Sequence, residues 1–420
     1  MSQKQDSSAI QANSCPFGPD GAGFNPLAAP DRAELHRQLR LARAEAPVFH
    51  STTLNMWVVS RYEDVITILK DSDRFAASAR TAILQSFPRV RHILEKTDTF
   101  SAPNMGFDGQ PAHDQLRAPV ARYFTPSAVA SRTSRIRAIV ADCIARLPEG
   151  SPVDIIESFA TPVAERVVMD LIGFPEGDYE EVVQYHEAIS GFFFSSPPVE
   201  RQLGYAQKIT ELESYIVRLI EQHRQSPQDD FIGFMLESAE TQYGAAELVS
   251  LISFDIFAAG IGPTAYVIAN LCRELLDNPG RWDELLSRPD LFDDSFTESL
   301  RHSGLFPGVF RAVMADAEVG GVVIPAGSVV WALLESADRD ESHFAEPDLF
   351  IPERPNLAKS LHFSHGLHYC LGVNFVRAVA KVALDLLMRH RPGMRLFTDQ
   401  VIGQRAGTNI LMPTRILVEW

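Results

Sequence analysis

A single cysteine lies in the stretch of this chain that is richest in reactive side chains. The stretch reads LHFSHGLHYCLG, residues 361–372, and places Cys370 between glycines, just before a helical pattern that starts near Leu371. Backbone N–H groups and the positive end of a helix dipole would point at the sulfur, which favours thiolate over thiol. Such a thiolate could be a metal ligand, or a nucleophile with His365 or His368 as its base, and a free cysteine before a helix can equally be a packing residue.

The spacing around the cysteine is more specific than the cysteine alone. It resembles the haem-thiolate signature of the cytochrome P450 family, F-x-x-G-x-H-x-C-x-G, with Ser364 where the family commonly has another glycine. The resemblance implies haem b as cofactor and a proximal thiolate that favours O–O cleavage. By the same resemblance Cys370 is the ligand of the haem iron, and the residues of the motif that surround the haem are Phe363, Gly366, His368 and Gly372.

Two further motifs place cations where the family binds the haem propionates. HDQLR contains His113 and Arg117, which are four residues apart and therefore share one face of a helix. PGVFR contains Arg311, which resembles the strand arginine of the family. By the resemblance these three residues bind the propionates, and a buried dianion requires such neutralisation.

A third pair of motifs resembles the ion-pair network of the family. ESLR contains Glu298 and Arg301, and PERP contains Arg354. Taken alone, the i,i+3 pair in ESLR would be an exposed helical pair worth about 0.2–0.5 kcal/mol. The resemblance implies instead that the three side chains form a buried structural network.

The most apolar helical stretch, FAAGIGPTAYV, contains a glycine and a proline side by side. The family has A-G-x-(D/E)-T-T here, and the acid and first threonine relay protons toward bound dioxygen. Ala259 and the glycine after it match, but Gly262 replaces the acid and Pro263 replaces the first threonine, which leaves only Thr264. Because Pro263 cannot donate to the carbonyl of Ala259, we expect the helix to kink or widen there and to leave room for a diatomic ligand and a water.

Several routes could deliver protons without the acid and the hydroxyl. Thr264 could turn inward, a water chain or a substrate hydroxyl could act, or the enzyme could use hydrogen peroxide directly. We expect a monooxygenase with a rewired relay that uses dioxygen. The alternatives are a peroxide-driven peroxygenase or a haem enzyme of another reaction type (isomerisation, dehydration or nitration). A haem-binding carrier or gas sensor is disfavoured because the chain has the loops and aromatic cover of a substrate cavity.

Four segments are expected to line the distal pocket, at about 79–105, 190–200, 254–264 and 305–310. Their apolar side chains indicate a hydrophobic small-molecule substrate of terpenoid, aromatic or steroid-like kind. The expected pocket residues are Leu84, Phe87, Phe192, Phe193, Phe254, Leu305, Phe306 and Val309.

The helix after Cys370 is basic in its first half. Arg377, Lys381 and Arg389 could form a docking patch for a separate ferredoxin or flavodoxin-type partner with a reductase, although Arg389 could equally balance the helix C-terminus.

The composition is that of an ordinary globular enzyme. Of the 420 residues, 45% are hydrophobic and 22% are charged, which excludes extensive disorder. A net charge of −16 without a Lys/Arg block excludes a nucleic-acid partner. Four widely spaced cysteines indicate a reducing cytoplasm. The N-terminus lacks an apolar segment and the longest uncharged run, Ile256–Cys272, is too short to span a bilayer, so we expect no membrane anchor.

The elements that position these residues are mostly helical. We expect residues 1–30 to form an N-terminal arm and residues 31–420 a single haem-thiolate catalytic domain. A helix capped by Asp31 precedes two short strands, helices dominate from about 112 to 300, and strands return with a hairpin that turns at Pro325–Gly327. Long loops are expected at 79–110 and 190–200. The fold class is mainly α with small β-sheets (α+β), and the resemblance implies a cytochrome P450 fold, a triangular prism of helices around a buried haem.

Overall fold

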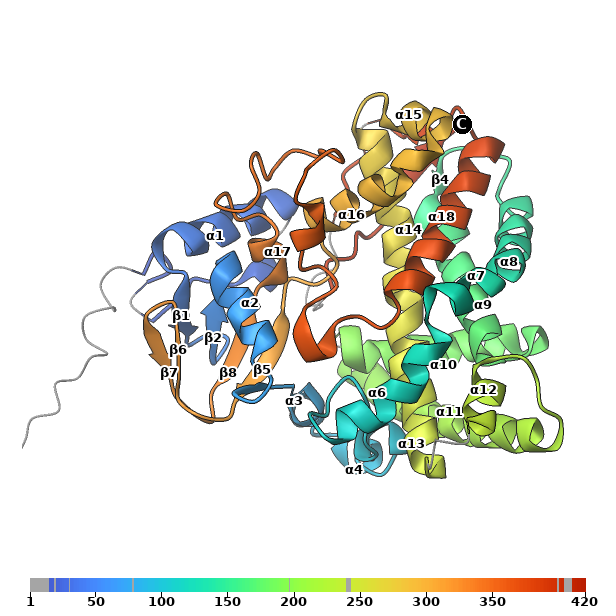
Figure 1. Cartoon of the computed structure of the whole chain (residues 1–420), viewed down its shortest axis with the longest axis horizontal. Helices are drawn as coiled ribbons and strands as arrows, with labels where there is room; N and C mark the ends of the chain where they lie inside the picture. The colour runs from blue at the N-terminus through green and yellow to red at the C-terminus, as the bar shows by residue number, and fades with distance from the viewer. Residues whose placement is uncertain are drawn as a thin grey trace, which may run out of the picture.

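The computed structural model describes the chain from residue 15 to its C-terminus with short gaps. The described residues are 15–18, 20–29, 31–77, 79–195, 197–238, 243–398, 400–403 and 410–420. Within them the chain is mostly helical with small sheets, as predicted. Figure 1 shows most of the larger helices gathered on one side of the molecule, and the main sheet with α1 (Arg32–Glu45) and α2 (Tyr62–Lys70) on the other.

The helices follow the periodic apolar patterns of the sequence. The predicted first helix is confirmed, because the Asp31 side chain accepts a hydrogen bond from the amide of Glu34 at 2.9 Å and caps it. The helices of seven residues or more are α1 Arg32–Glu45, α2 Tyr62–Lys70, α3 Ala79–Ser86, α6 Ala112–Tyr123, α8 Thr133–Ala145, α9 Thr161–Ile172, α10 Tyr179–Phe194, α11 Val199–Gln225, α12 Phe231–Glu237, α14 Ala259–Asp277, α15 Arg281–Ser287, α16 Phe292–His302 and α18 Val373–His390. The shorter α-helices are α4 Arg91–Leu94, α5 Asp98–Ser101, α7 Pro126–Ser131, α13 Ala245–Ser250 and α17 Leu334–Ala337, and short 3₁₀ turns include η8 Gly366–His368.

The strands form one five-stranded sheet and two smaller ones. The larger sheet has the order β1-β2-β8-β5-β3, and the smaller ones have the orders β4-β10-β9 and β6-β7. The bounds are β1 Val48–Ser51, β2 Met56–Val59, β3 Phe75–Ala76, β4 Val153–Asp154, β5 Val309–Val313, β6 Ala317–Val319, β7 Val322–Ile324, β8 Val329–Ala332, β9 Arg395–Leu396 and β10 Leu417–Glu419.

The hairpin predicted at Pro325–Gly327 is wrong. The hairpin joins β6 to β7 and turns at Gly320 and Gly321, whose φ angles are +56° and +79°. Two successive positive φ angles give the tight turn that matches strand twist, and glycine adopts them without strain. After β7 the chain changes sheet, and β8 pairs parallel to β2 and antiparallel to β5.

The prediction of long loops at 79–110 and 190–200 is also wrong. Residues 79–110 contain α3, α4 and α5, and residues 190–200 contain the end of α10 and the start of α11. The aromatic residues there are buried against one another: the Phe87 and Phe192 rings lie 4.8 Å apart, and the Phe193 and Phe254 rings lie 4.2 Å apart. Burial of large aromatic surface stabilises helical ends that the Ser- and Pro-rich sequence suggested were loops.

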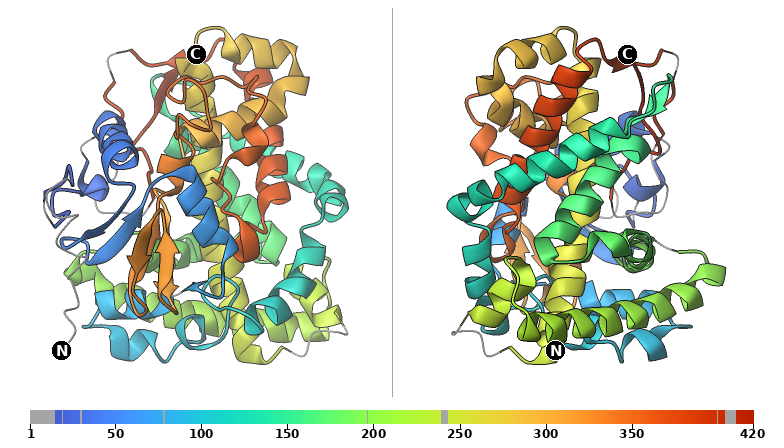
Figure 2. Two further views of the ribbon diagram at one scale, coloured as in Figure 1. Left: turned by 60° about the vertical axis from the view of Figure 1, so that its left-hand side comes forward. Right: turned by 90° about the vertical axis from the view of Figure 1, so that its right-hand side faces the viewer.

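A continuous helical run, Ala245–Asp277, crosses the helical part of the molecule; we call it the distal helix. It comprises α13, the π-helical segment η5 Leu251–Ala258, and α14, and it packs against α9, α16 and α18. Figure 2 shows α14, in yellow, passing through the helical part in both views. Among the described residues it is the one helix long and apolar enough to cross a membrane, and 61% of its most apolar window is buried inside the fold.

The distal helix widens earlier than expected. The widening was predicted at Pro263, but it lies in η5, where the amide of Ala259 donates to the carbonyl of Phe254, five residues back. The α-helical pattern resumes at Ala259 and continues through Pro263. A proline removes only its own donor, so the turns on either side can keep helical dihedral angles.

The described part of the expected N-terminal arm is packed on the molecule. Phe17 and Phe24 are buried, and their ring centroids lie 5.4 and 5.3 Å from that of Phe49 in β1. Residues 1–14 lie outside the described residues, and the boundary at residue 30 stays a prediction.

Candidate functional site

Hydrogen bonds within residues 361–372, the cysteine loop, present Cys370 at the start of α18. The amide of Cys370 donates to the carbonyl of Phe363 at 3.0 Å, and the amide of Tyr369 donates to that of Gly366 at 3.1 Å. Gly366 has a φ of +71°, and a Cβ there would lie 2.3 Å from the carbonyl oxygen of Leu69. Glycine is therefore required at this position, and the loop holds the sulfur in one place.

The departure from the family motif is visible as local strain. Ser364 has a φ of +64°, in the left-handed region that L side chains disfavour. Its hydroxyl is buried and has no hydrogen-bond partner. The glycine that the family commonly has here would avoid both costs.

Opposing effects act on the thiol of Cys370. Burial raises its pKa, while the amide of Gly372 and the charge of Arg117 lower it. Arg117 also donates to the carbonyl of Tyr369 at 2.5 Å, which keeps its charge beside the loop. A metal ion at the sulfur would tip this balance to thiolate, since a coordinating thiol is deprotonated.

Four predicted cofactor-binding side chains come together beside the cysteine loop. The rings of His113 and His368 lie 4.9 Å apart, and burial together with the charges of Arg311, His113 and Arg117 lowers the pKa of His368 to about 4. Arg311 is buried and donates to the carbonyl of Phe310 at 2.8 Å, and none of the described residues pairs a carboxylate with it. His113 Nε2 is buried without a partner. The other ring nitrogen of His113 pairs with Asp114 at 3.0 Å. The unpaired Arg311 and the free Nε2 of His113 fit a bound anion such as the propionates of haem.

One stripe of the distal helix is less buried than the rest of the helix and lies beside open space at Gly262, which we call the hollow. Between Leu248 and Cys272 every residue is buried except five, which follow the spacing of one helix face and which we call the open stripe. A Cβ added at Gly262 would meet no atom within 4 Å. Thr264 is 3% exposed and lies outside the stripe. The open stripe consists of Asp255, Ala259, Gly260, Gly262 and Pro263.

The expected pocket residues divide into two groups. Most lie in one apolar core, where the rings of Phe87 and Phe192 and those of Phe193 and Phe254 form two contacting pairs, which we call the aromatic cluster, and where Leu84, Leu305 and Phe306 also pack. Val309 packs against a second core that includes residues of the main sheet. Sequence reasoning missed Phe107, whose ring stacks 4.4 Å from that of Phe254, and Phe194, whose ring lies 6.3 Å from that of Phe306. Phe194 lies within the expected segment 190–200, and Phe107 lies two residues beyond the segment 79–105; the aromatic type of each was the available signal.

The expected ion-pair network is formed and buried. Arg301 donates to Glu298 through Nε at 2.6 Å and Nη2 at 2.7 Å, and Arg354 Nε donates to the same carboxylate at 3.0 Å. Both Glu298 and Arg301 are 0% exposed. Arg301 also donates to the carbonyls of Asp338 and Pro347, at 3.0 and 2.9 Å, so the network fastens α16 to the chain after β8.

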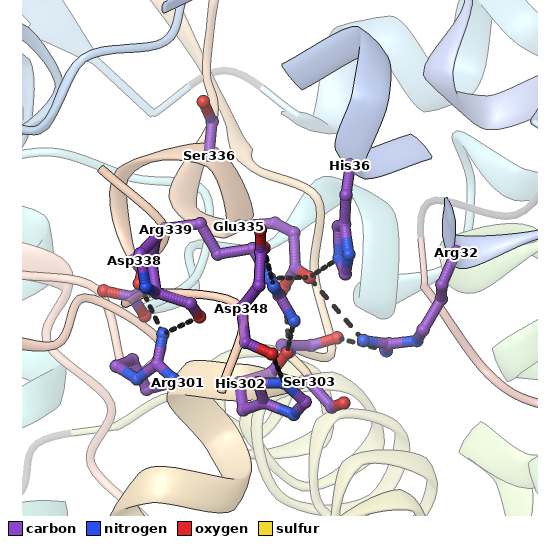
Figure 3. Close-up of polar contacts among 12 residues, drawn as sticks. Arg32, His36, Arg301, His302, Ser303, Glu335, Ser336, Asp338, Arg339 and Asp348 are labelled. Carbon is purple, nitrogen blue, oxygen red and sulfur yellow. Dashed lines mark hydrogen bonds and ion pairs between the residues drawn. The ribbon is translucent and has the colours of Figure 1, made fainter. Parts of the chain in front are cut away.

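A second buried charge cluster was not predicted (Figure 3). Glu335 accepts from His36 Nε2 at 2.8 Å and from the amide of Gly304 at 2.8 Å, and Arg32 and Arg339 approach it at 3.6 and 3.7 Å. The cluster joins α1 to α17 and to the end of α16. Its members are scattered over three hundred residues, so no local pattern could have indicated it.

The face near the start of α18 carries part of the expected docking patch. Arg377 and Lys381 lie 3.6 and 4.0 Å from the carboxylate of Asp293, and they line a shallow pocket of about 250 Å³. Arg389 pairs with Asp385 at 2.7 Å, one turn before it on α18.

Comparison with known proteins gives a consistent result. The family model described as cytochrome P450 matches residues 179–390. The chain is 30% identical to cytochrome P450 107B1 of Saccharopolyspora erythraea over 394 residues, which cover 90% of this chain and 92% of that protein. It is 30% identical to the mycinamicin IV hydroxylase/epoxidase of Micromonospora griseorubida, covering 81% and 83% of the two chains.

Solved structures agree in fold. The P450 haem domain of Tepidiphilus thermophilus superimposes with a TM-score of 0.86 at 26% identity, covering 94% of this chain and 96% of that one.

Proposed function

The chain belongs to the cytochrome P450 family of monooxygenases, and from that premise we propose that it inserts one atom of dioxygen into a hydrophobic small molecule. The observation that carries this proposal is the placement of Cys370 beside the buried Arg311, which none of the described carboxylates pairs with, and beside the buried, unpartnered Nε2 of His113. We propose residues 31–420 as one catalytic domain.

The cofactor of the family is a haem with a thiolate ligand, and we propose haem b. Cys370 would hold the iron, and His113, Arg117, Arg311 and His368 would hold the propionates. When bound, haem-thiolate activates dioxygen for insertion into an apolar substrate. The residues of this chain would hold the group, and the open stripe would border the hollow beside it.

The aromatic cluster supports a hydrophobic substrate of terpenoid, aromatic or steroid-like kind. Phe193 and Phe254 contribute large apolar surfaces next to the open stripe, and aromatic walls favour ligands of that kind.

Electrons would come from a separate ferredoxin or flavodoxin-type protein and its reductase, in the cytoplasm. Arg377 and Lys381 support this, because an acidic partner could compete with Asp293 for both cations.

A peroxide-driven reaction is the second candidate. The observation in its favour is that Gly262 and Pro263, at the positions of the family's acid and threonine, have no side chain that can donate a proton.

Isotope labelling tests the proposal. Holoenzyme, a surrogate ferredoxin with its reductase, and a panel of terpenoids, steroids and aromatic compounds are incubated under ¹⁸O₂. We expect a product with one ¹⁸O atom. Label that enters only from labelled hydrogen peroxide supports the second candidate, and no labelled product with either oxidant contradicts both.

A further inference from the structure

Asp255 is the one charged residue in the buried part of the distal helix, between Leu248 and Cys272. It lies in the π-helical segment η5 and belongs to the open stripe, four residues before Ala259 and seven before Gly262. π-Helical turns inside α-helices occur frequently at functional sites. The carboxyl therefore lies on the helix face that borders the hollow.

Two backbone amides hold this carboxyl group. The amide of Met105 lies 3.1 Å from Oδ2 and that of Gly106 lies 3.1 Å from Oδ1. Both amides belong to the turn between α5 and α6. A Cβ at Gly106 would lie 2.6 Å from Cε1 of Phe254, so the close approach of this turn depends on glycine. A carboxylate has about four acceptor sites, so each oxygen keeps one for a water in the hollow.

The same turn connects the carboxyl group to the cysteine loop. The carbonyl of Met105 accepts a hydrogen bond from Nδ1 of His368 at 3.2 Å, and His368 is two residues before Cys370. A single residue, Met105, thus separates Asp255 from the loop that carries the thiolate. This places the acid beside the space where the reaction would occur.

We propose that Asp255 holds the proton that the distal helix gives to a water in the hollow, in place of the side chains that positions 262 and 263 lack. The proposal rests on the proposed function. One proton moves: the O–H bond of Asp255 breaks as the proton passes to the water, and the carboxylate regains a proton from solvent. No electron moves in this step.

The charges around Asp255 suit this task. Burial and the charge of the nearby Asp108 raise the pKa of the carboxyl group, while the two backbone amides and the charge of Arg80 in α3 lower it. The resulting pKa is about 7. The positive charge of Arg117 in α6 also interacts electrostatically with the carboxyl group of Asp255. A group that titrates near neutral pH can both hold and release a proton.

Two further titratable groups lie on helices packed against η5. On α11, Glu213 accepts from the amide and the hydroxyl of Thr99 at 2.7 and 2.6 Å, and that hydroxyl lies 2.8 Å from the hydroxyl of Ser253. Ser253 is buried and is not part of the open stripe. On α10, burial lowers the pKa of His186 to about 4, so it is neutral at pH 7. Glu213, whose pKa burial also raises, is therefore a matched control.

Infrared spectroscopy of the holoenzyme tests the protonation directly, without turnover. We expect a protonated-carboxyl band that disappears as the pH rises through about 7, and that is missing in Asp255→Asn and present in Glu213→Gln. A spectrum without this band over the range of about pH 5 to 9 overturns the proposal.

Turnover tests the role. Dioxygen consumption is measured against pH with a surrogate ferredoxin and its reductase. We expect Asp255→Asn to be slower by at least about tenfold and to lose the pH dependence near neutrality, Asp255→Glu to keep it, and Glu213→Gln to match the unsubstituted enzyme.

The outcomes separate the two proposals. An active unsubstituted enzyme with an Asp255→Asn variant of equal rate and pH profile overturns the role of Asp255 alone. An unsubstituted holoenzyme that draws no electrons from ferredoxin overturns the proposed function and the role of Asp255 with it.

Discussion

His36 Nε2 lies 2.8 Å from Glu335 Oε1, so a residue of the first helix is bonded directly to a residue three hundred positions later (Figure 3). Burial alone would raise the pKa of Glu335, but the hydrogen bond from His36 and the charges of Arg32 and Arg339 outweigh it and lower the pKa to about 2. Burial also lowers the pKa of His36 to about 4, so at neutral pH His36 is a neutral donor and the arginines supply the positive charge.

This contact predicts an acid-sensitive stability. Because the pKa of Glu335 is lower in the folded state than its ordinary value of 4.5, its contribution is present above about pH 4.5 and is lost as the pH falls toward 2. Glu335→Gln should lower the free energy of unfolding at pH 7 by about 3–5 kcal/mol and flatten its decrease in acid. Denaturant unfolding at several pH values checks this. The control is Glu353→Gln, whose half-exposed pair with Arg281 should contribute less than about 1 kcal/mol. Equal effects of the two substitutions would contradict the expectation.

The strained serine of the cysteine loop gives a second prediction. Ser364→Gly should raise the free energy of unfolding by about 1 kcal/mol, because it relieves a left-handed backbone and removes an unpartnered buried hydroxyl. Thermal unfolding measures the change. Asn55→Gly is the control, since asparagine tolerates its φ of +51° and little change is expected. A less stable Ser364→Gly variant would show that the serine has a favourable contact.

The docking face gives a third prediction. Replacing both Arg377 and Lys381 with glutamine should raise KM for ferredoxin several-fold with kcat little changed, because charge complementarity acts mainly on association. Asp293→Asn should lower KM, since it frees both cations. Arg389→Gln, whose partner is Asp385, is the control and should match the unsubstituted enzyme. A KM that is insensitive to all of these changes places the docking site elsewhere.

The open stripe gives a fourth prediction. Replacing Gly262 with Asp and Pro263 with Thr in the Asp255→Asn background should restore reductase-supported turnover, because the acid and hydroxyl typical of the family return to the hollow. Gly262 has room for a side chain, since a Cβ there would meet no atom within 4 Å. Product formed per electron supplied is the measurement. If the triple variant is no faster than Asp255→Asn, proton delivery does not limit the rate.

Local patterns predicted much of the helical fold and the residues around the sulfur. The cap at Asp31 and the spacing of the cysteine motif are set by neighbours a few residues apart, which the sequence displays directly. The prediction of a hairpin at Pro325–Gly327 was wrong because β8 pairs with β2 and β5, and this pairing depends on distant strands. Periodicity alone does not report such partners.

The acid at the open stripe was visible in the sequence as one charge within an apolar helix, but its importance was not. Asp255 becomes informative only when Met105 and Gly106, 150 and 149 residues earlier, are seen to bond to it. The same holds for the cluster around Glu335, whose members come from separate helices.

The spectrum of the reduced protein with carbon monoxide tests the central claim most directly, that Cys370 is the thiolate ligand of a haem. We expect the Soret band at the long-wavelength position typical of thiolate ligation, its loss in Cys370→Ser, and no change in Cys15→Ser. A thiolate-type band that persists in Cys370→Ser, or a protein that binds haem without ever showing that band, would contradict the account.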